Sequence, residues 1–334
     1  MESGLTADET TVQVEGEPIR ISSPGKVLFP EQGWTKLDVV EHFIMCGSGA
    51  LRGVEGRPCL LKRWPHGVKE RPFFQKRVDP SMGETVIIRF PSARPGRMFV
   101  PRTLEDIIAM VQLGCIDLNP WTVRAEDPDH PDEMRLDLDP TPGVPWSDVR
   151  AVASVCRELL EEVGLVGWPK TSGSRGIHVY VRIEPRWTFH EVRRAVLALA
   201  REAERRIPAA TTAWWKEERH GVFIDYNQNA RDKTIASAYS VRDTGLVSTP
   251  FRWEELWDLD PHELSLVAFP SRWEAEGDPS KGIDEAVGSI EPLLEWVARD
   301  EAIGIGDAPW PPHYPKQPGE PPRVMPSRRK RDPD

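Results

Sequence analysis

The sequence predicts an α+β fold in which mixed β-sheets are flanked by helices. Four segments begin at residues that cap helices. Six short runs bounded by turn residues are typical of strands. These helices and strands interleave without the strict β-α-β-α alternation of a doubly wound sheet, so we favour α+β over that fold class.

Each expected helix starts at a hydroxyl residue that can accept a hydrogen bond from the first turn. These residues are Thr35, Thr103, Ser147 and Thr188. The helices are expected to end at Gly47, Gly114, Gly164 and Pro208. The fourth helix carries a capping box, because Glu191 follows Thr188 by three residues. The expected strands are 58–64, 85–90, 133–139, 177–183, 221–226 and 234–241.

The termini differ from the middle of the chain in composition. Residues 1–11 are expected to be disordered and acidic. Nine of the 33 prolines lie in residues 309–334, together with several arginines. We therefore expect a Pro/Arg-rich, mostly unpacked basic tail over 304–334. A single folded domain should occupy residues 12–303.

The formal net charge of −10, taken as a total, argues against nucleic-acid binding. The distribution of the charges along the chain gives a different result. Residues 20–102 carry 15 basic and 7 acidic residues, a net charge of +8. Residues 103–150 carry 3 basic and 11 acidic residues, a net charge of −8. We therefore expect a basic DNA-binding part over 12–120 and a catalytic part over 121–303.

Two classes of protein are excluded by composition. No apolar run approaches the ~18–20 residues that span a bilayer, so no membrane association is expected. The four cysteines are scattered and form no C-x-x-C pair, which argues against a zinc ribbon or a disulfide framework. The acidic N-terminus lacks the apolar stretch of a signal peptide. We expect a cytoplasmic protein.

The stretch 134–140, MRLDLDP, suggests a metal site. Side chains alternate faces along a strand, so Asp137 and Asp139 should share one face while Leu136 and Leu138 enter the core. Two neighbouring carboxylates repel each other unless a cation lies between them, and oxygen ligands suit Mg²⁺ or Mn²⁺. A solvated strand end is the commoner explanation of such a pair taken alone.

Two later stretches could complete a site for phosphoryl transfer. In 170–181, KTSGSRGIHVYV, small residues would let backbone N–H groups approach an anion, and Arg175 and His178 would add donors. In 222–229, VFIDYNQN, an apolar run delivers Asp225. A third carboxylate beside the first two would complete a two-metal site. Spacing alone leaves open whether Asp225 reaches that pair.

These three stretches, in this order, resemble the three motifs of the archaeo-eukaryotic primase superfamily, and most closely the polymerase domain of bacterial DNA ligase D and its stand-alone relatives. The resemblance covers roughly residues 12–300 and includes the flanking stretches PGKVLFP (24–30), KRWPHGV (62–68) and FFQK (73–76). It implies a primase-polymerase fold and a template-dependent nucleotidyltransferase that fills gaps or extends ends during DNA repair, with a preference for ribonucleotides.

The resemblance also implies roles for individual residues. Asp137, Asp139 and Asp225 would hold two divalent ions, with Mn²⁺ favoured over Mg²⁺. The NTP or dNTP substrate would be contacted by Ser172, Arg175, His178, Gln228, Arg242, Arg219 and Asn119. DNA would be contacted by Lys26, Lys36, Lys62, Arg63, Phe73, Phe74 and Lys76. Of these, Lys26 and Lys36 match positions that hold a 5′-phosphate at a gap or broken end, and one ring of the phenylalanine pair would stack on template bases.

Asn119 departs from the family pattern, which commonly has a histidine there, so phosphate or ribose contact at this position is in doubt. The sequence also lacks the K-x-D-G motif of nucleotidyl-transferring ligases. A separate DNA ligase, and an end-binding repair protein, are therefore expected partners, with the protein associated with the nucleoid. Three alternatives stay open: a de novo primase, a non-catalytic DNA end-binding module, and a metal-dependent nuclease or phosphoesterase.

Overall fold

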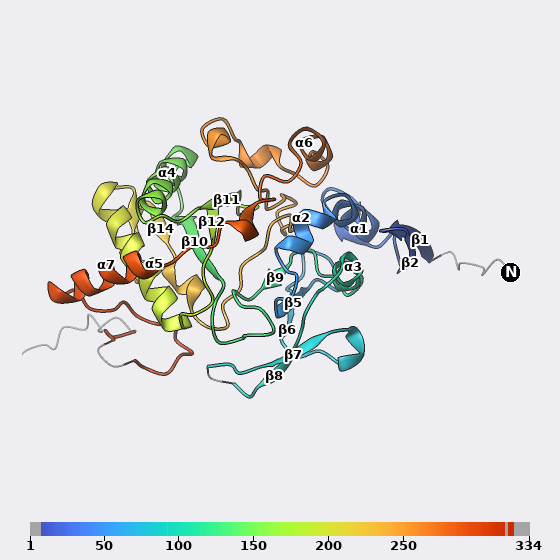
Figure 1. Cartoon of the computed structure of the whole chain (residues 1–334). Coiled ribbons are helices and arrows are strands. Elements are labelled where there is room, and N and C mark those ends of the chain that lie inside the picture. Colours follow the sequence, from blue (N-terminus) through green and yellow to red (C-terminus); the bar gives the residue numbers. More distant parts are fainter. Residues whose placement is uncertain (1–7, 92, 318–319, 324–334) are drawn as a thin grey trace, which may run out of the picture.

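Two β-sheets form the framework of the fold (Figure 1). A cavity lined by residues of both sheets lies between them. The computed structural model describes residues 8–91, 93–317 and 320–323. The α+β class predicted from the sequence is confirmed. Among the described residues, no helix has the length and apolarity needed to cross a membrane.

The first sheet has the strand order β11 (Trp168–Thr171), β12 (Ile177–Arg182), β10 (Glu133–Pro140), β14 (Val222–Ile224), β13 (Ala210–Thr211). Its pairs are antiparallel except β13 with β14. One face packs on α4 (Trp146–Glu162) and α5 (Phe189–Arg206), and α7 (Glu291–Ala302) packs against α5 (Figure 1). The apolar side chains of β10 and β12 are fully buried there, so the opposite face is left for polar groups.

The second sheet has the order β6 (Phe73–Gln75), β5 (Cys59–Arg63), β8 (Gly96–Phe99), β7 (Thr85–Ile88), with β9 (Asn119–Pro120) also paired to β5. The helices of this half are α1 (Lys36–Met45), α2 (Gly47–Arg52) and α3 (Leu104–Gln112). Two small hairpins precede them: β1 (Glu9–Val14) with β2 (Glu17–Ser22), and β3 (Val27–Phe29) with β4 (Trp34–Thr35).

The remaining elements are short and lie mostly in the last third of the chain. They are the helix α6 (Phe269–Glu276) and the 3₁₀ turns η1 (Pro80–Met82), η2 (Tyr226–Asn229), η3 (Trp253–Glu255), η4 (Pro261–Glu263) and η5 (Ile283–Glu285).

Three of the four predicted helix starts are confirmed. Thr35, Thr103 and Thr188 each accept a backbone hydrogen bond from the third helical residue and form reciprocal capping boxes. Ser147 is wrong as a cap, because α4 begins one residue earlier, after Pro145. Trp146 is held in the first turn by its indole N–H, which donates to the Leu259 carbonyl at 3.0 Å.

Residues 234–241 do not form the predicted strand. Their backbone N–H groups donate to separate partners, including Leu118 for Ser237 and Ile116 for Val241. Tyr239 adopts a positive φ of 65°, which interrupts extended backbone. Tyr239 and Val241 belong to the core of the second sheet. The chain therefore returns to the second sheet after β14.

Both predicted terminal segments differ from expectation in part. β1 begins at Glu9, so the end of segment 1–11 is paired in a hairpin, while residues 1–7 lie outside the described residues. Trp310, in the expected unpacked tail, is only 3% exposed and stacks on His190. The arginine cluster at 328–331 lies outside the described residues.

Arg193 of α5 explains why the segment after residue 303 is ordered. This side chain is fully buried, and its guanidinium donates to Asp307 at 2.8 Å, to the Ala308 carbonyl at 2.9 Å and to the Pro309 carbonyl at 3.1 Å. It also donates to the Asn227 amide oxygen at 2.7 Å. A buried charge needs such partners, because its desolvation is otherwise uncompensated.

Truncation after Ile303 is expected to lower the free energy of unfolding by about 3–5 kcal/mol, because it leaves the buried Arg193 charge without its carboxylate and carbonyl partners. Thermal unfolding of the truncated chain measures this. A chain ending at Arg323 keeps every one of these contacts and is the control. Equal melting temperatures for the two truncations would contradict the assignment.

Candidate active site

The polar face of β10 carries two carboxylates at the end of the strand. Leu136 and Leu138 are fully buried in the core, as the alternation predicts, so Asp137 and Asp139 lie on the opposite face. Asp137 pairs in register with His178 of β12, and Asp139 with Phe223 of β14. The His178 Nε2 lies 3.4 Å from the Asp137 Oδ1.

Asp225 reaches this pair, a point that sequence spacing left open. It follows β14 directly, and its backbone N–H donates to the Asp137 carbonyl at 2.9 Å. Its carboxylate accepts the Asn227 N–H at 2.9 Å, which starts the turn η2. Asn227 is in turn held by Arg193. The C-terminal segment therefore supports the turn that carries the third carboxylate.

Mutual repulsion and burial dominate the electrostatics of this trio. Burial, followed by the charges of Asp225 and Asp139, raises the pKa of Asp137 to about 8. Burial also raises the pKa of Asp225. Within the described part of the chain, none of the three carboxylates forms an ion pair with a lysine or arginine. Nearby charges such as Lys233 and Arg219 lower the pKa of Asp225 but do not offset its burial.

Glu133, at the other end of the same strand, is the contrasting case. It is fully buried among Arg57, Arg135 and Arg182, and its Oε1 lies 2.6 Å from the Arg135 Nε. These arginines hold its pKa well below the ordinary value despite its burial. The fold therefore neutralises one buried acid of β10 with arginines and leaves the other end of the strand unneutralised.

The chemistry of the unneutralised trio fits divalent cations. Oxygen-only ligands are what Mg²⁺ and Mn²⁺ prefer, and a cation would remove the repulsion that raises the pKa of Asp137. The side-chain amide of Gln228 donates to the Asp137 Oδ2 at 3.2 Å, and its buried Oε1 has no partner. No three His, Cys, Asp or Glu side chains of the described residues are already at coordinating spacing.

The loop between β11 and β12 borders the carboxylates. Ser172 organises it, since its hydroxyl oxygen accepts the backbone N–H groups of Ser174 at 3.1 Å and Gly176 at 3.0 Å. Arg242 donates to the Ser172 carbonyl at 2.5 Å. Gly176 is required here, because a Cβ would lie 2.3 Å from the Leu138 carbonyl oxygen. The close approach fixes the loop against β10.

A cavity of about 330 Å³ joins the loop to the carboxylates. Nine of the residues singled out from the sequence line it: Lys62, Asn119, Asp137, Asp139, Ser172, Arg175, His178, Gln228 and Arg242. Asp225 supports its floor from β14 without lining it. Arg219 does not line it either, because its guanidinium stacks on Phe223 at 3.5 Å from the ring centroid and donates to the carbonyls of Ala213 and Trp214.

Sequence reasoning missed two buried groups at this cavity. Asp117 accepts from Lys62 at 2.8 Å and from the Asn119 amide at 3.1 Å, and it lies 3.9 Å from the Arg242 Nε. Lys170 lies behind His178, with its Nζ 2.8 Å from the His178 Nδ1. The register of β11 with β12 pairs Lys170 with His178, and no signal within the sequence predicts that register.

The remaining predicted DNA contacts lie on the other half. Phe73 and Phe74 of β6 are about half exposed. Lys36 donates to Gln112 at 3.1 Å, and burial and the nearby Lys26 lower its pKa. Arg63 is engaged with the Leu113 carbonyl and Gln75, and Lys76 lies 3.5 Å from Asp232.

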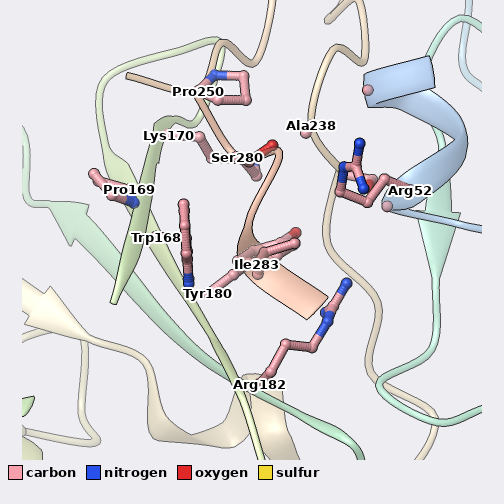
Figure 2. A pocket seen from close by; sticks show the side chains of 13 residues that line it. Arg52, Trp168, Pro169, Lys170, Tyr180, Arg182, Ala238, Pro250, Ser280 and Ile283 are labelled. Atoms are coloured by element: carbon pink, nitrogen blue, oxygen red, sulfur yellow. The ribbon is translucent and has the colours of Figure 1, made fainter. Parts of the chain in front are cut away.

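A second, smaller hollow lies beside the main cavity on the same sheet face (Figure 2). It measures about 30 Å³, and Lys170 and Tyr180 line it together with Trp168 and Arg182. The remaining wall comes from the end of α2 with Gly53, and from Pro169, Ser237, Ala238, Pro250, Ser280 and Ile283. A hollow of this size has room for about two water molecules.

Comparison with known proteins identifies the family. The LigD primase-polymerase domain family matches residues 35–280. This chain belongs to that family. The polymerase domain of Mycobacterium tuberculosis Ligase D, solved in complex with DNA, superposes with a TM-score of 0.73 at 29% identity, over 80% of this chain and 98% of that one. The predicted resemblance and the primase-polymerase fold are thereby confirmed.

Two curated relatives are multifunctional non-homologous end joining proteins LigD. The protein from Pseudomonas aeruginosa is 32% identical over 261 residues, which cover 76% of this chain and 31% of the relative. The protein from Mycolicibacterium smegmatis is 30% identical over 270 residues, which cover 78% of this chain and 35% of the relative. The chain thus spans about a third of the length of these relatives.

The contrast between the two ends of β10 yields a prediction for the metal-free protein. The pKa of Asp137 rises from 3.8 to about 8 on folding, so the folded chain binds the extra proton between these values and stability falls as pH rises across them. Above about pH 8, Asp137→Asn removes this penalty and should increase the free energy of unfolding by at least about 1 kcal/mol.

Glu133→Gln is the matched control in the same strand. It leaves three buried arginines without their shared carboxylate and should cost about 3–5 kcal/mol. Denaturant unfolding of both variants in chelator measures the two effects. Destabilisation by Asp137→Asn of the same size as by Glu133→Gln would show that Asp137 is already neutralised by the protein.

Proposed function

We propose that this chain is a template-dependent nucleotidyltransferase that fills short gaps or extends ends in DNA repair, with ribonucleotides preferred. The observation that carries the proposal is the trio Asp137, Asp139 and Asp225, unpaired with lysine or arginine in the described residues, at the floor of a cavity lined with phosphate-binding donors. Membership in the LigD primase-polymerase family supports the same reaction class.

The three aspartates are the residues that would hold two divalent ions, Mn²⁺ or Mg²⁺. When bound, such ions lower the pKa of a 3′-hydroxyl and neutralise the charge of a pyrophosphate leaving group. The Gln228 amide orients Asp137 through their hydrogen bond. Asp139 is exposed at the cavity, where it faces the incoming substrate.

The cavity wall supplies the contacts for an incoming NTP or dNTP. Ser172 retains its hydroxyl proton for a phosphate oxygen, because both of its hydrogen bonds within the loop are accepted ones. Arg175 and Arg242 add positive charge, and Arg242 is fixed by the Ser172 carbonyl. Asn119 can donate a hydrogen bond here but cannot be protonated as a histidine can.

Template and primer would approach over the second sheet. Residues directly opposite in an antiparallel pair share a face, so Phe74 lies on the face of Lys62, which lines the cavity, and Phe73 lies on the face of Arg63. An exposed aromatic ring offers a base-stacking platform without sequence preference. We assign the stacking role to Phe74. Lys26 and Lys36 would hold the 5′-phosphate of a downstream strand.

The relatives' names place them in non-homologous end joining, and we extend that pathway to this chain. A separate DNA ligase would then seal the filled product, and an end-binding protein would bring the ends together. The protein would act at the nucleoid.

Extension of a primer across a gapped duplex tests the function. Wild-type protein with Mn²⁺ should add ribonucleotides faster than deoxyribonucleotides, and a downstream 5′-phosphate should increase the rate. Asp137→Ala and Asp139→Ala should abolish incorporation, a loss of at least ~10³-fold, while DNA binding persists. Robust extension by either variant would contradict the proposal. Degradation of DNA without nucleotides would instead indicate a nuclease.

The phenylalanine pair gives a second, graded test. Phe74→Ala should weaken template-dependent extension by roughly 10-fold, because stacking of one base on an aromatic ring contributes ~1–3 kcal/mol. Phe73→Ala, an equally exposed residue on the opposite face, is the control and should change extension less than twofold. A larger effect at Phe73 than at Phe74 would reverse the assignment.

A further inference from the structure

Lys170 is a buried lysine that the proposed reaction does not yet use. It is 3% exposed, and its Nζ has three hydrogen-bond partners. These are the His178 Nδ1 at 2.8 Å, the Ala236 carbonyl at 2.8 Å and the Ser248 hydroxyl at 2.6 Å. Figure 2 shows this side chain at the wall of the smaller hollow, which Pro169 and Ser280 also line.

Two of these partners must accept hydrogen bonds from Lys170. A carbonyl oxygen can only accept, and the Ser248 hydroxyl donates its own proton to the Thr171 carbonyl at 2.7 Å. Both therefore take a proton from Nζ. The contact with His178 then has two possible forms. A Lys170 ammonium would donate its third N–H to the Nδ1 lone pair, whereas a neutral Lys170 amine would accept a hydrogen bond from an Nδ1–H.

The surroundings of the ring favour the ammonium. On its other side, the His178 Nε2 faces the Asp137 Oδ1 at 3.4 Å, and when a bound cation keeps Asp137 ionised, its carboxylate favours an N–H over a nitrogen lone pair. The Lys170 Nζ also lies 5.2 Å from the Tyr180 ring centroid, a position that suits a cation. Burial, Arg242 and Arg135 lower the pKa of Lys170 well below its ordinary value despite the opposing charges of Asp137 and Glu133, so the ammonium is supported by the hydrogen-bond geometry and the ring contact alone.

We propose that Lys170 is a positioning residue that fixes His178 as the tautomer with its proton on Nε2, so that the ring presents an N–H donor to the cavity. The inference rests on the proposed function, in which the acceptors would be phosphate oxygens of the incoming nucleotide. The opposite tautomer would present a lone pair to the same oxygens and repel them. Lys170 acts only through His178, since it does not line the main cavity.

The tautomer can be measured without nucleotide or activity. Long-range ¹H–¹⁵N correlation spectra of histidine-labelled protein distinguish a protonated ring nitrogen from an unprotonated one, and His178→Gln assigns the signal. Wild-type protein with saturating Mg²⁺, which keeps Asp137 ionised, should show a protonated Nε2 and an unprotonated Nδ1. A protonated Nδ1 with an unprotonated Nε2 overturns the proposal. This measurement needs no Lys170 variant and stands if the chain has no polymerase activity.

Nucleotide kinetics then test whether Lys170 acts through the ring. Lys170→Met should raise KM for the nucleotide by roughly 10- to 100-fold, as expected when a group that orients a ligand-binding histidine is lost. In a His178→Gln background the same substitution should change KM less than twofold, because coupled residues are not additive. Equal effects of Lys170→Met in the two backgrounds would overturn the proposal.

Ser248→Ala is the matched control. It removes one Lys170 partner and leaves the contact with His178. The His178 tautomer should therefore stay the same, and KM should change less than twofold. In Lys170→Met, water from the adjacent hollow can satisfy the Ala236 carbonyl and the Ser248 hydroxyl, which favours a folded variant. A Ser248→Ala protein with the opposite His178 tautomer would contradict the role of the ammonium contact.

Discussion

Repulsion between three clustered carboxylates at the end of β10, two of them partly buried, is the constraint on which the rest of the structure depends. Asp137, Asp139 and Asp225 meet because β10 pairs with β12 on one side and β14 on the other. In the low-dielectric interior such a cluster is costly unless a cation neutralises it. The raised pKa of Asp137, to about 8, is the sign of that cost in the metal-free chain.

The surrounding fold holds the cluster in place rather than neutralising it. Helices α4 and α5 bury the apolar face of β10 and leave its polar face toward the second sheet. Arg193 links the C-terminal segment to Asn227, whose backbone N–H is capped by the Asp225 carboxylate at the start of the turn η2. The arginines around Glu133 show that this fold can neutralise a buried acid on the same strand. Among the described residues, no arginine forms an ion pair with the trio, although Arg175 and Arg242 line the same cavity.

Much of this could be predicted from the sequence, where local rules apply. The threonine caps and the alternation of Leu136 and Leu138 with Asp137 and Asp139 are short-range patterns, and both are confirmed. The failures concern long-range structure. The segment around Tyr239 resembles a strand in composition but packs irregularly into the core of the second sheet, and Trp310 packs on Arg193 of a distant helix. Lys170 and Asp117 were missed because their importance depends on strand register and on side chains more than 50 residues away.

The direct test of the account is a measurement of Mn²⁺ binding in the presence of a nucleoside triphosphate. Binding is measured as the decrease of the free Mn²⁺ signal in electron paramagnetic resonance. Wild-type protein should bind Mn²⁺ together with the nucleotide. Asp137→Asn should lose that binding while it stays folded and, in chelator above about pH 8, becomes more stable than wild type. Equal Mn²⁺ affinity for wild type and Asp137→Asn would contradict the account, because the cation would then be held somewhere other than at the end of β10.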